Sequence, residues 1–158
     1  MGQAVKRIDL ALEETFATVR PHLKWRDGPA KMNERRNSFT NTADGEVSVG
    51  RTRYVRTSLS KAKLAELAER VEKHWRAVGY KIGDVHSSEP AFSGTASDGC
   101  IIKFAVGGSG NVYFYAGVGA ISPGYGGEVE GEEGDRFPKA PNGGPDYTPD
   151  VRDPYWSK

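Results

Sequence analysis

The chain has 158 residues, and its 22 Lys and Arg nearly balance its 21 Asp and Glu, for a formal net charge of +1. This length predicts one domain of ordinary size, and the near-neutral balance argues against a global field that would attract nucleic acid or an anionic membrane. No run of 18 apolar residues occurs, so no membrane-spanning segment is predicted. The lone cysteine, Cys100, excludes a disulfide within the chain.

The first residues, MGQAVKRIDLALEE, lack the apolar core of a signal peptide. The sequence as written therefore predicts a cytoplasmic protein, and a single cysteine fits a reducing compartment. The alternative is an extracytoplasmic protein from which an N-terminal signal has been removed.

Two amphipathic helices are predicted in the first half of the chain. In the first, apolar side chains recur every three or four residues from Val5 to about Leu23. The second follows a capping serine, Ser58 or Ser60, and ends before Gly79, which stands where a left-handed C-cap residue is expected. Its apolar face consists of Leu64, Leu67, Ala68, Val71, Trp75 and Val78.

Strand-like segments occupy most of the remaining chain up to residue 120. Residues 46–60 alternate and are rich in Val, Thr and Tyr, with a bulge expected at Gly50. Four further segments are closely spaced and predict an antiparallel meander: YKIGDVHS, AFSGTAS, CIIKFAV and NVYFYAGV. Residues 24–44 are polar and predict a loop. The order is α-β-α-β-β-β, and it predicts an α+β two-layer sandwich with two helices on one face of a four- to five-stranded, mainly antiparallel sheet.

Residues 1–120 are predicted to form this single domain, and residues 121–158 a Gly/Pro-rich acidic tail. About a third of the tail is Gly or Pro, a composition typical of disordered segments. However, residues 1–78 carry 16 Lys and Arg against 10 Asp and Glu, whereas the tail carries 4 against 8 and also aromatic rings. We therefore expect an extended tail without helix or strand that docks on the domain or on a partner, with residues 128–135 its most mobile part and residues 137–156 in contact.

Four motifs in about residues 10–120 have a recognisable arrangement. They are WRDG after the first helix, the Arg-rich RTRYVRTSLS, the helix end HWRAVGYKI, and an SDG turn before GNVYF. Together they resemble a group of small actinobacterial lipoprotein-like proteins of unknown function. The resemblance implies export, a lipidated N-terminal cysteine and a pair of loop cysteines, but this sequence has neither a lipobox nor the loop cysteines. The group supplies no catalytic residue.

The sequence predicts no catalytic residue, metal site or cofactor. Its histidines, His22, His74 and His86, lack partners at the spacing of a zinc site, and Cys100 is expected to be a small buried apolar residue. The glycine-rich GGSGN and PGYGG precede no helix, so they predict turns rather than a phosphate-binding loop. The acidic EVEGEEGD lacks the ligand spacing of a calcium loop and is expected to be solvated.

Two sets of side chains form the predicted binding surface. Alternation places Arg51 and Arg53 on one side of their strand; if that side faces solvent, they make a cationic stripe with Arg56, which the loop residues Arg35 and Arg36 would extend. Tyrosines on the opposite face from Phe114, and the aromatic end of the tail, complete the surface. The predicted binding residues are Arg51, Arg53, Arg56, Tyr54, Tyr113, Tyr115, Tyr155 and Trp156.

Exposed tyrosine and arginine together favour protein recognition. The predicted function is accordingly a non-enzymatic binding domain that contacts an unknown protein partner through the open sheet face and the tail. One alternative is a small enzyme with a pocket beneath the tail. The other is a single-stranded nucleic-acid binder that uses the Arg-rich strand, which the near-neutral charge makes the weaker prediction. No feature of the sequence indicates which oligomeric state the protein adopts.

Overall fold

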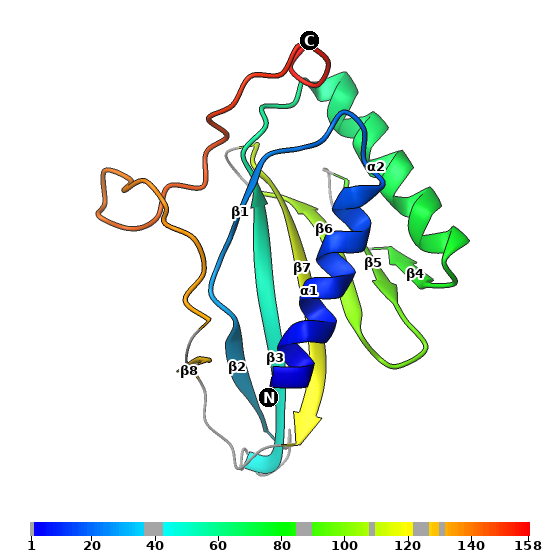
Figure 1. Cartoon of the computed structure of the whole chain (residues 1–158), viewed down its shortest axis with the longest axis vertical. Coiled ribbons are helices and arrows are strands. Elements are labelled where there is room, and N and C mark those ends of the chain that lie inside the picture. Colours follow the sequence, from blue (N-terminus) through cyan, green and yellow to red (C-terminus); the bar gives the residue numbers. More distant parts are fainter. Residues whose placement is uncertain (1, 37–42, 85–89, 108–109, 122–126, 130–131) are drawn as a thin grey trace.

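The computed structural model of the chain describes residues 2–36, 43–84, 90–107, 110–121, 127–129 and 132–158 (Figure 1). These residues form two α-helices and eight β-strands, which confirms the predicted α+β class. In chain order the elements are α1 (Gly2–Ala17), β1 (Trp25–Asp27), β2 (Lys31–Arg36), β3 (Ala43–Val55), α2 (Lys61–Ala77), β4 (Lys81–Asp84), β5 (Phe92–Thr95), β6 (Ile101–Val106), β7 (Val112–Ile121) and β8 (Gly127–Glu128).

The strands form one open antiparallel sheet. Seven of them follow the order β4-β5-β6-β7-β3-β2-β8, and β1 pairs with β3 beyond the end of β2. The predicted meander is present as β4-β5-β6-β7. The predicted number of strands is too low, because it does not include β1, β2 and β8.

The missed strands β1 and β2 lie in the segment predicted to be a loop. Their sequences, WRD and KMNERR, are polar and lack apolar alternation. Main-chain pairing with β3 holds both of them in the sheet, and backbone hydrogen bonds do not require apolar side chains. The two strands lie end to end along one edge of β3, separated by residues 28–30. Arg35 and Arg36 therefore belong to a strand rather than to a loop.

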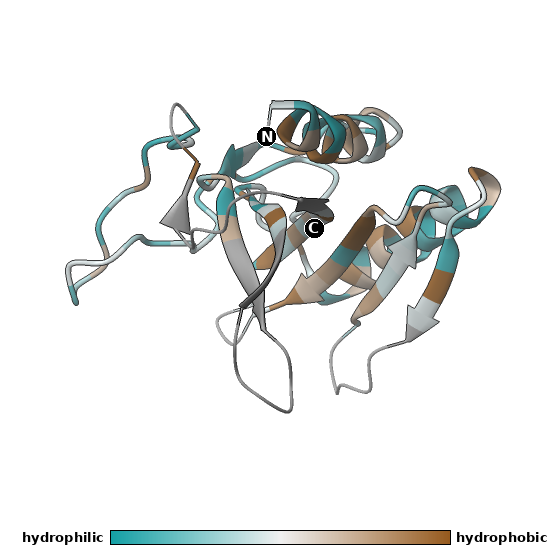
Figure 2. Ribbon diagram, turned by 90° about the horizontal axis from the view of Figure 1, so that it is seen from below, coloured by the Kyte–Doolittle hydropathy of each residue, from teal (hydrophilic) through white to brown (hydrophobic). Residues whose placement is uncertain are grey.

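Both helices pack against the sheet, as predicted. Figure 1 shows α1 in front of β3 and β7, and Figure 2 shows the same helix above the middle of the sheet. The interior is rich in aromatic rings, including Phe104 and Phe114, which are at most 1% exposed. Trp75 of α2 donates its indole N–H to the hydroxyl of Thr15 in α1 at 3.0 Å, so one buried hydrogen bond joins the two helices. Full burial of a side chain such as Phe104 or Phe114 contributes about 1.5–3 kcal/mol to the stability of the fold.

The ends of the helices follow the sequence signals in part. The cap of α2 is confirmed, because the side chain of Ser60 accepts a hydrogen bond from the backbone N–H of Lys63 at 3.2 Å. Gly79 follows this helix with a φ of 90°, as expected for a residue in the left-handed region. Helix α1 ends at Ala17, earlier than the predicted end near Leu23. Of the helices that the structure describes, neither is long and apolar enough to cross a bilayer.

The bulge expected at Gly50 is absent. Gly50 pairs with Gly117 on one side and with Lys31 on the other, in a register that its neighbours in β3 continue. The register shift in this part of the sheet lies in β2, between Glu34 and Arg36. Gly50 instead leaves room for the ring of Tyr115 on the sheet face opposite the helices.

The tail runs back along the β1–β2 edge of the sheet toward α2 (Figure 1). The prediction that it contains no strand is wrong, since β8 pairs with β2. Further along, Val151 forms a parallel bridge with Thr57, and Trp156 is fully buried. The segment predicted to be most mobile, residues 128–135, includes residues 130 and 131, which lie outside the described residues; so does most of PGYGG.

Candidate functional site

A cleft lies between the tail and the sheet face opposite the helices, which we call the open face. Its volume is about 320 Å³, and four of its lining residues are aromatic. The lining comes from the junction of β1 and β2, from β3 and β7, and from the tail. The lining residues that define its chemistry are Lys31, Gly50, Tyr54, Tyr115, Glu133, Asp135, Phe137 and Tyr147. We call it the aromatic cleft.

Tyr115 of β7 lies over two glycines of the open face. A Cβ atom at Gly50 would overlap the Tyr115 ring, and one at Gly117 would come within 2.6 Å of the Tyr115 hydroxyl. Because these glycines are paired across β3 and β7, they leave room for the ring against the sheet. The ammonium of Lys103 lies 5.8 Å from the centroid of the same ring. Burial raises the pKa of Tyr115, so its phenol stays protonated at neutral pH.

Three rings join the tail to the open face, and we call them the aromatic clasp: Tyr54, Phe137 and Tyr147. The rings of Tyr54 and Tyr147 are stacked with centroids 4.0 Å apart. Phe137 meets them edge-on, at 5.4 Å from Tyr54 and 5.5 Å from Tyr147. The pKa of Tyr54 is raised, first by burial and second by a hydrogen bond with the hydroxyl of Tyr147. Tyr54 therefore packs in this stack as a neutral, half-buried phenol, while Tyr147 covers it from the solvent side.

The tail segment inside the clasp closes on itself. Ala140 N–H donates to the carbonyl of Gly144, and Asp146 N–H donates to the carbonyl of Pro138, both at 2.7 Å. The resulting loop projects from the body of the molecule (Figure 1). Phe137 and Tyr147 stand at its base, so the clasp holds both ends of the loop against the open face.

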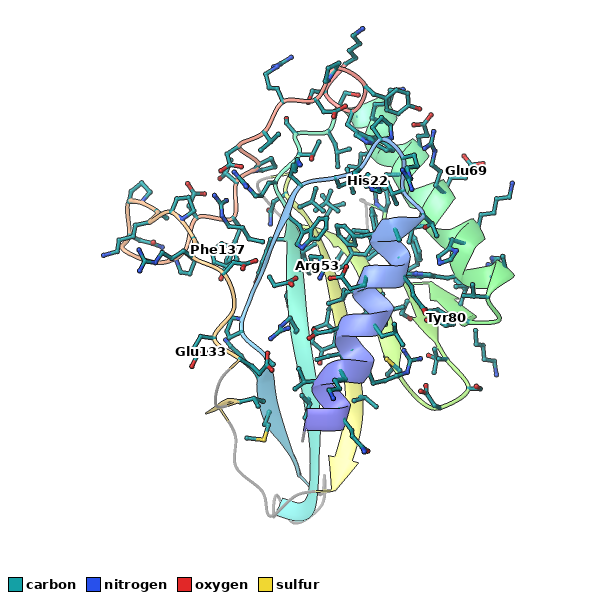
Figure 3. The ribbon with its side chains drawn as sticks, viewed as in Figure 1. His22, Arg53, Glu69, Tyr80, Glu133 and Phe137 are labelled. Atoms are coloured by element: carbon teal, nitrogen blue, oxygen red, sulfur yellow. The ribbon has the colours of Figure 1, made fainter. Side chains whose placement is uncertain are left out.

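Before the clasp, the tail runs along the edge formed by β1 and β2. Ala30 N–H donates to the carbonyl of Glu132 at 3.0 Å, and Asp135 N–H donates to the carbonyl of Asp27 at 2.8 Å. A carboxylate oxygen of Asp135 accepts the N–H of Asp27 at 2.7 Å. Glu133 is exposed and has no hydrogen-bond or ion-pair partner within the described part of the chain. Figure 3 shows it at this edge, below Phe137. The aromatic cleft thus has an acidic wall.

Arg51 and Arg53 do not face solvent. They are 7% and 1% exposed and lie on the helix-covered face of the sheet. Arg51 pairs with Asp9 of α1 and with Glu132 of the tail, each at 2.7 Å. The prediction of a solvent-facing cationic stripe is therefore wrong for these two residues. The side chains alternate as expected, but carboxylates from α1, β1 and the tail pair with the arginines on the covered face.

Arg53 is an internal anchor for α1 (Figure 3). Its guanidinium donates to both carboxylate oxygens of Asp27, at 2.6 and 3.0 Å, and to Glu13 at 2.8 Å. It also lies 4.9 Å from the centroid of the Phe16 ring and 4.6 Å from that of Trp25. A charge buried to this degree is tolerated because it is paired and hydrogen-bonded. The role of Arg53 is structural.

Three other predicted binding residues lie away from the aromatic cleft. Arg56 follows β3 and donates to Asp150 of the tail at 2.9 Å. Trp156 donates its indole N–H to the carbonyl of Pro21 at 2.7 Å. Tyr155 donates its hydroxyl to a glutamate of α2 at 2.6 Å. These contacts hold the end of the tail against the body of the protein.

Three of the eight predicted binding residues, Arg51, Tyr54 and Tyr115, belong to the lining of the aromatic cleft, although the guanidinium of Arg51 is paired on the helix-covered face. Tyr113 lies beside Tyr54 with ring centroids 6.2 Å apart. The sequence predicts contact for residues 137–156 of the tail, a range that includes Phe137 and Tyr147, but neither of them is among the predicted binding residues. Among the lining residues that the sequence prediction missed are Lys31, Gly50, Glu133 and Asp135. Glu133 and Asp135 belong to the acidic run expected to be solvated, and no local signal relates that run to the tyrosines.

A second hollow, of about 430 Å³, lies near the end of β3. It is lined by His22, Leu23, Lys24, Trp25 and Arg56. It brings together one aromatic ring, whereas the aromatic cleft brings together four, and its Arg56 is already paired with Asp150. The aromatic cleft is therefore the better candidate.

Groups typical of catalysis or metal binding are dispersed. Cys100 is 2% exposed and burial raises its pKa, which confirms the prediction of a buried residue. His22 is exposed, burial lowers the pKa of His74 in α2, and His86 lies outside the described residues. Within the described ranges, no three His, Cys, Asp or Glu side chains are grouped so that they could hold a metal ion.

Comparison of the chain with protein-family models, with curated proteins and with solved structures found no match. The resemblance to actinobacterial lipoprotein-like proteins accordingly stays a prediction.

Proposed function

We propose that the protein is a non-enzymatic binding domain that holds a chemical group of its partner in the aromatic cleft. The observation that carries this proposal is the convergence of four rings from β3, β7 and the tail on one cleft of about 320 Å³. This volume is near the lower end of the range for ligand pockets. Aromatic rings with polar ends supply much of the energy at recognition surfaces.

The protonated phenols of Tyr54 and Tyr115 argue against a tyrosine that acts as a general base or a nucleophile in this cleft. The pKa values of Tyr54 and Tyr115 are raised, mainly by burial. A phenol with a raised pKa is a hydrogen-bond donor at neutral pH rather than a general base or a nucleophile. A small enzyme would use the same cleft and would need Glu133 or Asp135 for proton transfer. Turnover of any substrate that is lost in Glu133→Gln or Asp135→Asn would support the enzyme instead.

Binding of single-stranded nucleic acid through the Arg-rich strand has less support. Arg51 and Arg53 are buried and paired with carboxylates, and Arg56 is paired with Asp150. Phosphate contacts need accessible cations, and their affinity falls as salt concentration rises. An oligonucleotide affinity that falls steeply with salt and is lost in Arg56→Gln would favour this alternative.

Nuclear magnetic resonance tests the binding domain directly. A fragment library is titrated into ¹⁵N-labelled protein, and the amides that shift are mapped on the structure. We expect hits to shift Gly50, Thr52, Tyr115 and Glu133. Binding should persist in Tyr115→Phe, which keeps the ring, and weaken in Tyr115→Leu, which removes it. A library whose hits cluster around the second hollow, or that yields no hit, would contradict the proposal.

A further inference from the structure

Of the charged side chains that line the aromatic cleft without an ion-pair partner among the described residues, negative charges outnumber positive ones. Glu132 and Glu133 are consecutive, but Glu132 pairs with Arg51 on the helix-covered face, whereas Glu133 lines the cleft. Asp135 also lines the cleft, with one oxygen engaged by a backbone N–H. Lys31 is the remaining ionised group of the lining, since the guanidinium of Arg51 is paired. Two carboxylates thus oppose one ammonium.

The rings of the cleft are arranged to receive positive charge. Tyr115 has one ring face against Gly50 and Gly117, which leaves its other face turned away from the sheet. A cation already lies near this ring, because the ammonium of Lys103 is 5.8 Å from its centroid. The face of an aromatic ring attracts cations through its quadrupole, most strongly those with a weakly hydrated surface. A neighbouring carboxylate adds to this attraction.

We propose that the aromatic cleft binds an organic cation, a quaternary ammonium or guanidinium group, between the ring of Tyr115, the aromatic clasp and the carboxylates of Glu133 and Asp135. This inference rests on the proposed function and specifies its ligand. The volume of about 320 Å³ suits one small cation or the end of one basic side chain. The group therefore comes either from a free small molecule or from an arginine or a trimethylated lysine side chain of a protein partner.

Lys31 gives the inference its sharpest consequence. It lies on β2 at the cleft, is exposed, and has the same charge as the proposed ligand. Removing this charge should strengthen the binding of a cation, whereas it would weaken the binding of an anion and leave a neutral sugar nearly unaffected. Removing the charge of Glu133 should have the opposite effect, so that a cation binds more weakly and an anion more tightly. Glu69, exposed on α2 and distant from the cleft, provides the matched control (Figure 3).

The test is an NMR titration with three cationic probes at constant ionic strength: choline, an arginine-containing tripeptide and its trimethyl-lysine counterpart. The neutral isostere 3,3-dimethylbutanol, N-acetylglucosamine and inorganic phosphate are the comparison ligands. We expect cations to shift the amides of Gly50, Tyr115 and Glu133, with millimolar affinity. The isostere should bind about threefold more weakly, the size expected from a cation–π contact at an exposed site. Tighter binding of choline would indicate a small molecule, and tighter binding of a peptide would indicate a protein partner.

The variants decide the outcome. Glu133→Gln should weaken cation binding by about two- to fivefold, Lys31→Gln should strengthen it by a similar factor, and Glu69→Gln should change neither affinity nor thermal stability. All three positions are exposed, so the variants should fold. If the isostere, the sugar or phosphate binds the cleft as well as the cations, or if Lys31→Gln weakens cation binding, the cation inference is overturned while the binding domain stands. If no ligand shifts the amides of the cleft, the cation inference fails, and the fragment library decides whether the binding domain fails with it.

Discussion

The ring of Tyr147 stacks on the ring of Tyr54, with centroids 4.0 Å apart and planes inclined by 9°. One residue belongs to the tail and the other to β3, so this contact fixes where the tail crosses the open face. Phe137 meets both rings edge-on and closes the base of the projecting loop. One wall of the aromatic cleft therefore depends on the clasp, so the proposed ligand binding should be coupled to the docking of the tail.

Removing the stacked ring should free the loop. In Tyr147→Ala we expect trypsin to cleave after Arg136 and Lys139, both exposed, several times faster than in the unaltered protein. An aromatic pair contributes about 0.5–1.5 kcal/mol, which corresponds to an opening about two to ten times more frequent. Limited proteolysis with mass spectrometry measures this change. Tyr147→Phe keeps the ring and should cleave at the original rate; equal rates in all three proteins would mean that the clasp does not hold the loop.

Two glycines of the open face should respond differently to substitution by alanine. A Cβ atom at Gly50 would overlap the ring of Tyr115, whereas a Cβ atom at Gly119 would meet nothing within 4 Å. Gly50→Ala should therefore displace the ring and destabilise the protein by about 1–3 kcal/mol. Gly119→Ala should stay within about 0.5 kcal/mol of the unaltered protein. Urea unfolding measures both values, and the ring resonances of Tyr115 should shift in the first variant alone.

The relief of this clash provides a further check. In the double variant Gly50→Ala, Tyr115→Leu the smaller side chain leaves room for the new methyl group. The cost of Gly50→Ala should then be smaller than in the presence of the tyrosine, which is a coupling between two residues in contact. Additive costs would indicate that Gly50 is required for a reason other than the position of the ring.

The elements with apolar periodicity could be predicted from the sequence. The stripe of α2 and the alternation in β6 and β7 specify which side is buried, and Phe104 and Phe114 on that side of the two strands lie in the core. The polar strands β1 and β2 could not be predicted, because their stability comes from pairing with β3. The residues of β3 that pair with them come later in the chain, and no periodicity within β1 or β2 indicates this pairing.

The burial of Arg51 and Arg53 illustrates a second limit. Val49 and Val55 lie on the same side of β3 and are buried, so the sequence contained a signal that this side faces inward. The two arginines between these valines indicate the opposite, a solvent-facing side, because a buried arginine needs carboxylate partners that the local sequence does not show. Those partners come from α1, β1 and the tail. The cleft is unpredictable for the same reason, because the path of the tail brings its walls together.

Arg53 should be essential for stability. In Arg53→Ala the carboxylate of Asp27 would lose its bidentate partner in a largely buried site, and such a change costs about 3–5 kcal/mol. Arg53→Lys should recover little of this, because an ammonium cannot replace the planar fork between two oxygens. Arg152→Ala, at an exposed position of the tail, is the control and should be nearly neutral. Urea unfolding decides; a loss below about 1 kcal/mol in Arg53→Ala would show that the pair is dispensable.

Trp156 should make the tail an integral part of the fold. It is fully buried and donates to the carbonyl of Pro21 at 2.7 Å. Trp156→Ala should reduce the free energy of unfolding by about 3–5 kcal/mol. Trp156→Phe retains most of the buried ring but lacks the donor, so its loss should be intermediate. Removing Lys158, the exposed last residue, should have no measurable effect. If Trp156→Ala unfolds at the same urea concentration as the unaltered protein, the end of the tail does not contribute to the core.

Asp150 should make the attachment of the tail dependent on pH. The guanidinium of Arg56 holds the pKa of this carboxyl below its ordinary value of 3.8. A lowered folded-state pKa adds stability that is fully present above the ordinary value and is lost as pH falls through the lower one. Asp150→Asn should therefore destabilise the protein at pH 7, by about 0.2–1 kcal/mol because the pair is a third exposed.

The difference between Asp150→Asn and the unaltered protein should disappear below the folded-state pKa of Asp150, where both side chains are neutral. The backbone N–H groups of Asp150 and Val151 still donate to the carbonyl of Arg56 in the variant, so the tail should stay paired there. Thermal unfolding from about pH 2.5 to 7 measures the difference, and Glu69→Gln controls for the loss of an exposed carboxylate. Because the pair is partly exposed, about 1 M salt should also reduce the difference. An effect that persists undiminished in acid would show that Asp150 stabilises the tail by a contact other than its charge.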